Sequence, residues 1–453
     1  MPHGATILAH AFGARYELPI PLLLFVLGGG AVVVLSFAVI ARRSVAVGVG
    51  VADRSVVTAR PALGAGGLLA LGALVAIGLL GSQEVSENLL PTVFWLLVWI
   101  AVPLSCGLLG DWTRQVNPFA TLARLGSRLR RPVLGSEQPL TWPRWLGWWP
   151  ATGLFFVLAA GELIFNQTAT LPRVTAAGLL GYAVLSAFCG LLFGPLWLER
   201  GEMFSVLLST WGRLGYFRFA ARGRRGFMGG LDEPFEATPS RVAFVLLLLV
   251  SVNVDGLLAT PLWSRLQLQL PQSVGPGTAA FQGSLTAGFL LLTLVVAVVF
   301  AGFALASARL AEPGRRSALA SLTALLPSLV PIALGYLLAH NLEYLVVNAQ
   351  LLIPLLGNPT GLASWPIHLP APFNDTFEVH RTLLPSAVYW YISLAVIVTV
   401  HVVAVLLAHR HVAGAALDER RARRSEYPWL LAMVGYTMLS LWLLAQPLVL
   451  ERQ

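Results

Sequence analysis

The sequence predicts an all-α integral membrane protein, and three observations support this fold class. Hydrophobic residues make up 57% of the 453 residues and charged residues only 11%, against about 25% charged residues in soluble domains. The mean hydropathy is +0.75. Apolar runs of about 20 residues, long enough to cross a bilayer as a helix, recur along the chain. This composition excludes a soluble globular enzyme and a disordered chain.

The apolar runs predict about ten transmembrane helices (range about 9–12) in a single polytopic membrane domain over 1–453. We expect an outer loop region over 341–385, whose first part either continues the preceding helix or folds back into the membrane. The expected spans lie near 18–40, 62–81, 90–110, 146–165, 174–198, 241–263, 285–307, 318–340, 386–408 and 427–448.

Arginine supplies all 30 basic residues, and its distribution predicts the orientation of the chain. Five arginines lie on one side of the membrane, and 25 lie in or beside the loops 41–61, 111–145, 199–240, 308–317 and 409–426. Because cytoplasmic loops are enriched in basic residues, we expect these loops inside and both termini outside. The same bias explains the net charge of +9, so the expected partner is the lipid bilayer and no nucleic acid.

Two of the arginine-rich loops are expected to contain amphipathic cytoplasmic surface helices. The first begins after Asn117-Pro118, a cap residue followed by a residue suited to the first turn. The second is expected over 203–225. Helices on the inner membrane surface and helices packed beneath the bundle both fit these patterns. The apolar stripe of the first helix consists of Phe119, Leu122, Leu125 and Leu129.

The same two loops suggest a parallel repeat of helix hairpins. Residues 120–126 are Ala-Thr-Leu-Ala-Arg-Leu-Gly, and residues 209–215 are Ser-Thr-Trp-Gly-Arg-Leu-Gly. Each segment follows an inward-running span and precedes an outward-running span, as in transporters built from repeats. Similarity of this length also arises by chance, so both interpretations stay open.

Three ionisable residues are expected near the outer ends of three spans: Glu162, Asp255 and His340. An ionisable side chain at that depth normally faces the bundle interior or a wet cavity. We therefore predict that they converge on one outward-facing cavity, with Glu343 at its rim. Simpler interpretations are that Glu162 reaches the interface, that Asp255 bonds a neighbouring helix, and that His340 and Glu343 lie on a solvated face.

Histidines provide a second set of candidate residues. His401 is expected within the ninth span and His409 near its cytoplasmic end. His401 fits an interhelical hydrogen-bond donor, a metal or haem ligand, or, together with His409, a proton relay. A bound transition metal ion is expected to use His10, Asp255, His340 and His401.

Several short motifs follow one another in a fixed order along the chain. They are residues 9–21 (Ala-His-Ala-Phe-Gly-Ala-Arg-Tyr-Glu-Leu-Pro-Ile-Pro), Gly110-Asp111-Trp112 with Asn117-Pro118-Phe119, Gly161-Glu162-Leu163, Val254-Asp255-Gly256, Ala339-His340, and His401-Val402-Val403-Ala404-Val405 leading to Ala408-His409. With these motifs the chain resembles the polytopic bacterial membrane proteins named fenitrothion hydrolase. The resemblance implies location in the bacterial cytoplasmic (inner) membrane and hydrolysis of an organophosphate triester.

A hydrolase of that kind would need a metal-activated water, because the sequence has no serine elbow, phosphate loop or HExxH helix. The ligands of such a metal would be Glu162, Asp255, His340 and either His401 or His10. Carboxylate and imidazole together suit zinc, iron, manganese or copper and do not choose among them.

Three function classes follow from these patterns. The first is a membrane protein with an outward-facing carboxylate–histidine site that moves or binds protons, metal ions or a small solute. The second is a membrane-bound metal-dependent hydrolase or the partner of a membrane oxidoreductase. The third is a structural subunit of a membrane complex, with other subunits or further copies of the chain as partners. We favour the first class because nothing in the sequence places a nucleophile or a cofactor.

The predicted orientation can be tested with reporters fused after Gln453. Since both termini are expected outside, a reporter that works only in the periplasm or exterior should be active there. A reporter that works only in the cytoplasm should be silent at this position and active in the loop 111–145. Activity of the cytoplasmic reporter after Gln453 would contradict the orientation.

Overall fold

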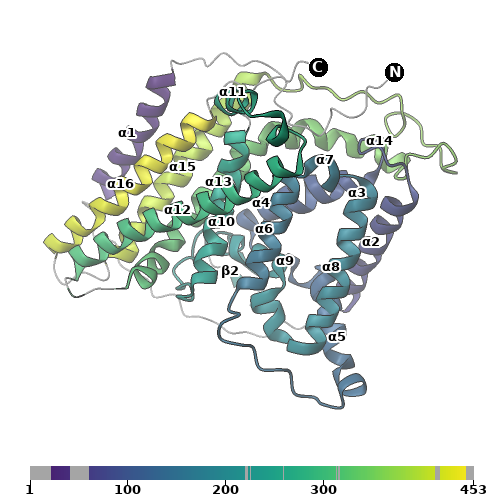
Figure 1. Ribbon diagram of the computed structural model, residues 1–453, viewed down its shortest axis with the longest axis horizontal. Coiled ribbons are helices and arrows are strands. Elements are labelled where there is room, and N and C mark those ends of the chain that lie inside the picture. The colour runs from purple at the N-terminus through teal and green to yellow at the C-terminus, as the bar shows by residue number, and fades with distance from the viewer. Residues whose placement is uncertain are drawn as a thin grey trace. The chain divides into compact units, whose positions relative to one another are not determined.

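The computed structural model describes residues 22–40, 61–219, 223–224, 226–258, 260–312, 314, 317–413 and 419–444. These residues are mostly helical, and the helices, labelled in Figure 1, group into two compact units. The apolar, helical architecture is that of a multi-pass membrane protein, as the composition predicts. The single domain expected over 1–453 stays a prediction. Of the described residues, unit 1 contains those within 61–228 and 341–384, and unit 2 contains those within 22–40, 229–340 and 385–444.

Unit 1 is built from helices and one short antiparallel hairpin. Its α-helices are α2 (Pro61–Leu80), α3 (Leu89–Pro91), α4 (Val102–Leu109), α5 (Pro118–Leu134), α6 (Trp149–Leu163), α7 (Asn166–Ala169), α8 (Pro172–Phe193), α9 (Met203–Trp211) and α14 (Leu352–Gly357). Its other elements are the π-helices η1 (Thr92–Ala101) and η3 (Trp197–Gly201), the 3-10 helices η2 (Thr113–Gln115) and η5 (Ala349–Leu351), and the strands β1 (Phe217–Arg218) and β2 (Gly223–Arg224).

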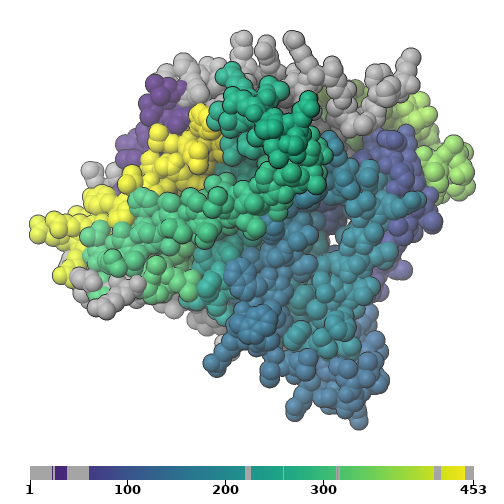
Figure 2. Space-filling view, viewed as in Figure 1, coloured from purple at the N-terminus to yellow at the C-terminus, as the bar shows by residue number. Residues whose placement is uncertain are grey.

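Unit 2 is a bundle of longer helices. They are α1 (Leu22–Ile40), α10 (Pro239–Leu258), α11 (Pro261–Leu268), the 3-10 helix η4 (Gln272–Val274), α12 (Ala279–Ala311), α13 (Ala318–Asn348), α15 (Ser386–Ala413) and α16 (Glu419–Leu444). The boundary between the units falls within α13, after His340. Figure 2 shows α12 in green on the surface of unit 2, where its exposed side chains include Leu290, Leu291, Leu294 and Val298.

Seven helical segments of the described residues are long and apolar enough to cross a membrane, judged by length and composition alone. Each overlaps one of the ten expected spans. The seven segments are Pro61–Leu80, Leu89–Leu109, Pro172–Phe193, Pro239–Leu258, Ala279–Ala311, Ala318–Gly357 and Ser386–Val412.

The other three expected spans differ from these seven in length or polarity. The expected span 18–40 contains α1, within which Val26–Phe37 is the apolar segment found among the described residues, and the expected span 146–165 contains the shorter apolar helix Trp149–Leu163. The last helix, α16, begins at Glu419, so four arginines occupy its first two turns. The count of ten spans and the location of both termini stay predictions.

The first expected amphipathic helix is present as α5, but its buried face differs from the predicted stripe. Leu125 and Leu129 are exposed, whereas Ala123 and Gly126 are buried. The small residues bring α5 very close to α8. A Cβ on Gly126 would lie 2.1 Å from a backbone carbonyl of α8, and a Cβ on Gly190 would lie 2.2 Å from the carbonyl of Ala123. The contact therefore depends on glycine, as in close packing of membrane helices.

Helix α5 runs in the same direction as α8 and follows its second half. The ring centroids of Phe119 and Tyr182 are 4.6 Å apart. One turn from the end of α5, Arg130 donates from Nε to the carbonyl of Leu191 (2.6 Å) and from Nη2 to that of Gly190 (3.1 Å). The guanidinium thus supplies donors to carbonyls at the end of α8, where Gly190 also accepts from the backbone nitrogen of the cap residue Gly194. This packing favours the alternative of a packed helix over one lying free on the membrane surface.

The second expected amphipathic helix, over 203–225, is wrong in extent, and its burial fits the alternative of a packed helix. Helix α9 ends at Trp211, and seven of its nine residues are buried. The chain then turns, because it passes directly against an earlier loop: a Cβ on Gly215 would lie 2.0 Å from the backbone nitrogen of Gly110. After this turn, β1 pairs with β2.

The two segments that suggest a sequence repeat have different local structures. Residues 120–126 lie inside α5, whereas 209–215 include the end of α9 and the following turn. The parallel repeat therefore stays a prediction.

The expected outer loop region begins with helix. Helix α13 continues to Asn348 and is followed by η5 and α14, and turns occupy 358–385. Gln350 in η5 holds this loop, because its side-chain amide donates to the carbonyl of His380 and accepts from the backbone nitrogen of the same residue.

The close contact between α5 and α8 can be tested by adding one methyl group. Gly190→Ala should lower the melting temperature of the detergent-purified protein, because overpacking against backbone costs about 1–3 kcal/mol. Gly178→Ala, on the same helix, is the matched control, since nothing lies within 4 Å of its added Cβ. Equal melting temperatures for the two variants would contradict the packing.

Candidate functional site

Asp255 and His340 lie within hydrogen-bonding distance in unit 2. His340 Nε2 is 2.6 Å from Asp255 Oδ2, and the two side chains are 13% and 17% exposed. Asp255 lies in the last turn of α10, and His340 lies 22 residues after the start of α13. The pair therefore joins two candidate spans, and two of the residues predicted to converge are in contact.

A neutral hydrogen-bond network lies next to this pair on α10. The side-chain amide of Asn253 donates to Leu249 O (3.1 Å) and to the hydroxyl of Tyr436 on α16. The same hydroxyl donates to Leu249 O over 3.2 Å. Because Asn253 and Tyr436 are buried and bonded to each other, they tie α10 to α16.

His401 is fully buried at the centre of unit 2. Its Nδ1 lies 2.7 Å from the carbonyl of Ile397, so this nitrogen carries the proton. The lone pair is therefore on Nε2, for which the described residues supply no hydrogen-bond partner. The ring of Tyr336, on α13, lies edge-on at a centroid distance of 6.4 Å, and its hydroxyl likewise has no partner among the described residues.

His409 lies two turns further along α15 and contacts a residue that the sequence did not single out. Its Nδ1 is 2.9 Å from Oε1 of Glu426 on α16, and both side chains are buried. His409 was expected near the cytoplasmic end of the ninth span, and the structure places it four residues before the end of α15.

Two other predicted site residues belong to unit 1. Glu162 lies at the end of α6 and accepts a 2.5 Å hydrogen bond from Trp99 Nε1. Glu343, expected at a cavity rim, is buried with 7% of its surface exposed. Since Asp255 and His340 belong to unit 2, the cavity shared by all four residues stays a prediction. His10 lies outside the described residues.

The candidate metal ligands do not form a larger cluster in the described part of the chain. Within those residues, no three His, Cys, Asp or Glu side chains come together as a metal-ligand group. Asp255 and His340 together would supply two ligands.

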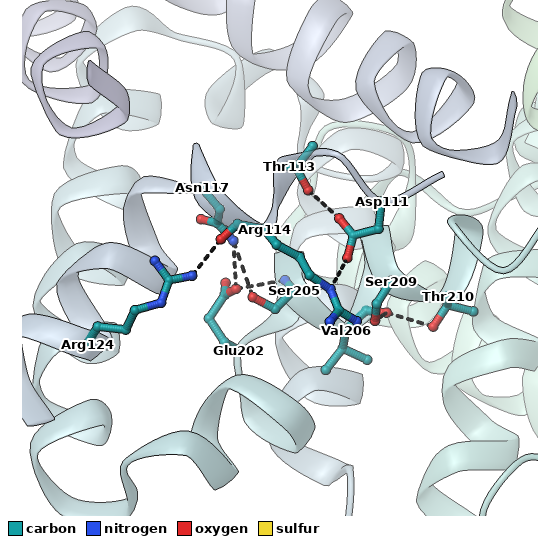
Figure 3. A network of polar contacts seen from close by, with 10 residues as sticks. All are labelled: Asp111, Thr113, Arg114, Asn117, Arg124, Glu202, Ser205, Val206, Ser209 and Thr210. Atoms are coloured by element: carbon teal, nitrogen blue, oxygen red, sulfur yellow. Dashed lines mark hydrogen bonds and ion pairs between the residues drawn. The ribbon is translucent and has the colours of Figure 1, made fainter. Parts of the chain in front are cut away.

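Unit 1 contains a buried carboxylate that joins the starts of two helices (Figure 3). Glu202 is 0% exposed and caps α9 by accepting from the backbone nitrogens of Phe204 (3.1 Å) and Ser205 (2.7 Å). Its Oε2 also accepts from Asn117 Nδ2 at 2.9 Å, and its Oε1 from the Tyr182 hydroxyl at 2.5 Å. Both oxygens are therefore satisfied, as a buried charge requires.

Asn117 is itself the cap of α5, because its side-chain oxygen accepts from the backbone nitrogens of Phe119 and Ala120. The hydrogen bond between Asn117 and Glu202 therefore connects two helix N-termini, whose positive dipole ends favour a carboxylate. Tyr182, about halfway along the candidate span α8, contacts the starts of both helices, through Phe119 of α5 and Glu202 before α9.

Charged side chains continue this network toward solvent. Arg124 donates to the carbonyl of Arg114 (2.5 Å), and Arg114 pairs with Asp111 (2.7 Å), as Figure 3 shows. Burial lowers the pKa of Arg124, and the nearby Glu202 carboxylate acts in the opposite direction.

Sequence reasoning missed Glu202 and Glu426 for one reason. Both stand beside arginines, in stretches that are typical of solvated loops. The one available signal for Glu202 was its place directly before the apolar run of α9, where an acidic residue is a good helix cap.

Comparison with known proteins identifies no relative, because no family model, no curated protein and no solved structure matches this chain.

Removal of the shared cap should destabilise unit 1 strongly. Glu202→Ala leaves Asn117, Tyr182 and two backbone N–H groups without their acceptor, so we expect a loss of about 2–4 kcal/mol, measured as a lower melting temperature. Glu199→Ala, three residues earlier and exposed, is the control and should leave stability unchanged. A small effect of Glu202→Ala would show that the cap is dispensable.

Proposed function

We propose that this chain is a multi-pass membrane protein that binds and moves protons through unit 2, with the Asp255–His340 pair as its outer site. The carrying observation is the 2.6 Å contact between Oδ2 and Nε2. Ionisable residues within membrane helices are costly and are typical of proton and ion pathways. A carboxylate and an imidazole at this distance exchange one proton along a single hydrogen bond.

The position of the pair supports access from the side opposite to the arginine-rich loops. Asp255 is 16 residues from the start of α10, or about 24 Å at 1.5 Å per residue. If those loops are cytoplasmic, the pair lies in the outer part of the membrane, and its partial exposure allows exchange with water there.

Further polar groups extend from the pair through the interior of unit 2. Tyr336 is one helical turn before His340 on α13, and its ring lies 6.4 Å from the rings of both His401 and Tyr436. These spacings exceed a direct hydrogen bond, so a proton would cross them through intervening water. His401 and His409 lie on one helix, two turns apart. The order Asp255–His340, His401, His409 fits a relay along the bundle.

Binding of a metal ion or of a small solute at the same pair is the second candidate within this class. The support for a metal is the donor set of one carboxylate and one imidazole, which suits several transition metals. A metal site would require further ligands.

Proton flux into liposomes that contain the purified protein tests the proposal. A membrane potential that is negative inside is imposed, and a pH-sensitive dye is enclosed. Protons should then enter through the wild-type protein and acidify the lumen. Asp255→Asn and His340→Gln should each slow this flux about 10²-fold or more, because each removes a proton-transfer group.

The matched controls are Asp375→Asn and His368→Gln, which change exposed groups in the loop after α14 and should keep the wild-type rate. An absence of wild-type flux, or full flux in Asp255→Asn, would contradict proton movement through this pair.

A further inference from the structure

We infer that Glu426 and His409 form a second proton-binding site at the arginine-rich end of unit 2, with Glu426 receiving the proton on Oε2. This inference rests on the proposed function, since it names the inner site of the same pathway. The inner site contains neither Asp255 nor His340, so the two sites can be tested separately.

The geometry of the pair shows an acceptor that is buried and unfilled. Oε1 of Glu426 is 2.9 Å from His409 Nδ1, and the side chains are 4% and 9% exposed. For Oε2, the described residues supply no hydrogen-bond donor. A buried carboxylate oxygen without a donor costs free energy. Protonation of Oε2 removes this cost, because a neutral carboxyl group needs less solvation than a carboxylate.

Neighbouring helices fix both residues in the interior. On α16, Trp429 lies one turn after Glu426; its backbone nitrogen donates to Ser307 of α12, and its indole Nε1 donates to Ser328 of α13. These bonds hold α12, α13 and α16 together at the level of the pair. Glu426 therefore cannot turn toward bulk solvent without disturbing three helices.

A cavity of about 80 Å³ lies at the same end of the bundle. Its lining is mostly apolar, and its polar residues are Ser307, Glu312, Ser321 and His411. This volume is sufficient for a few water molecules, and the polar residues provide partners for them. Ser307 also accepts from the backbone nitrogen of Trp429, so the lining reaches the helix that carries Glu426.

Other charged and titratable groups lie on the elements at this end of unit 2. Neither α1 nor the described first three turns of α13 contains a titratable residue. The charged and titratable groups there include Arg309 and Glu312 at the end of α12, Arg241 at the start of α10, Asp232 in the segment before α10, Arg410 and His411 on α15, and Arg420, Arg421, Arg423, Arg424 and Tyr427 on α16.

The proton step balances without a co-reactant. An O–H bond of a hydronium ion beside Glu426 breaks, an O–H bond forms at Oε2, and water remains. Release toward the interior reverses the same bond changes, with His409 Nδ1 keeping its hydrogen bond to Oε1. No electrons are transferred.

Infrared spectroscopy of the full-length protein in lipid tests the site without any transport measurement. On acidification, the protonated Glu426 should give a carboxyl C=O band that shifts in D2O. Glu426→Gln should remove this band, whereas Asp255→Asn should leave it in place. Glu137→Gln, which changes an exposed carboxylate, is the control and should also retain the band.

A band that persists in Glu426→Gln would overturn the inference. If Glu426→Gln fails to fold, His409→Gln provides the second test, because loss of the imidazole should shift the same band; an unshifted band would overturn the pairing. A measurement of proton flux separates this inference from the proposed function. If the Glu426 band is present but the wild-type protein shows no proton flux, the proton-binding site is supported and proton transport is contradicted. Flux that is lost in Asp255→Asn but unchanged in Glu426→Gln would remove the inner site alone.

Discussion

The hydrogen bonds of the Glu202 carboxylate join the starts of α5 and α9, and the packing of unit 1 follows from that junction. One oxygen accepts from Asn117, which caps α5, while both oxygens accept from the first backbone nitrogens of α9. Two helix dipoles are thereby neutralised by a single charge within an apolar setting. The glycine contacts of α8 then allow α5 to lie against it, so electrostatics and close packing act on the same pair of helices.

Three acidic residues in this chain show how hydrogen-bond partners and exposure distinguish a fixed structural carboxylate from one suited to proton exchange. Glu202 has all its acceptor positions occupied, which suits a fixed ion. Asp255 contacts one imidazole and keeps some exposure, which suits exchange. Glu426 lies between these cases, because it is buried like Glu202 but has one oxygen without a donor among the described residues.

The sequence was sufficient to predict the helices that form without contacts to distant parts of the chain. In lipid a segment such as Pro172–Phe193 must satisfy its own backbone, so length and apolarity determine it. Asp255 and His340 were recognisable as candidates because a charge stands out in an apolar run. Glu202 and Glu426 did not stand out, since their burial depends on contacts with Asn117 and with α15 that sequence spacing does not reveal. The predicted extent of α9 was wrong for a similar reason. The chain that follows α9 lies directly against Gly110, and sequence spacing does not reveal this contact.

The shared cap also has a consequence for the synthesis of the chain. Asn117 and Glu202 are 85 residues apart, so at roughly 5–20 residues per second the ribosome adds the partner about 4–17 s after the cap of α5. During this interval the start of α5 lacks its carboxylate, while α6 and α8 emerge. The junction between the starts of α5 and α9 can therefore form only after α8 has been synthesised, which makes it a late step in the biogenesis of unit 1.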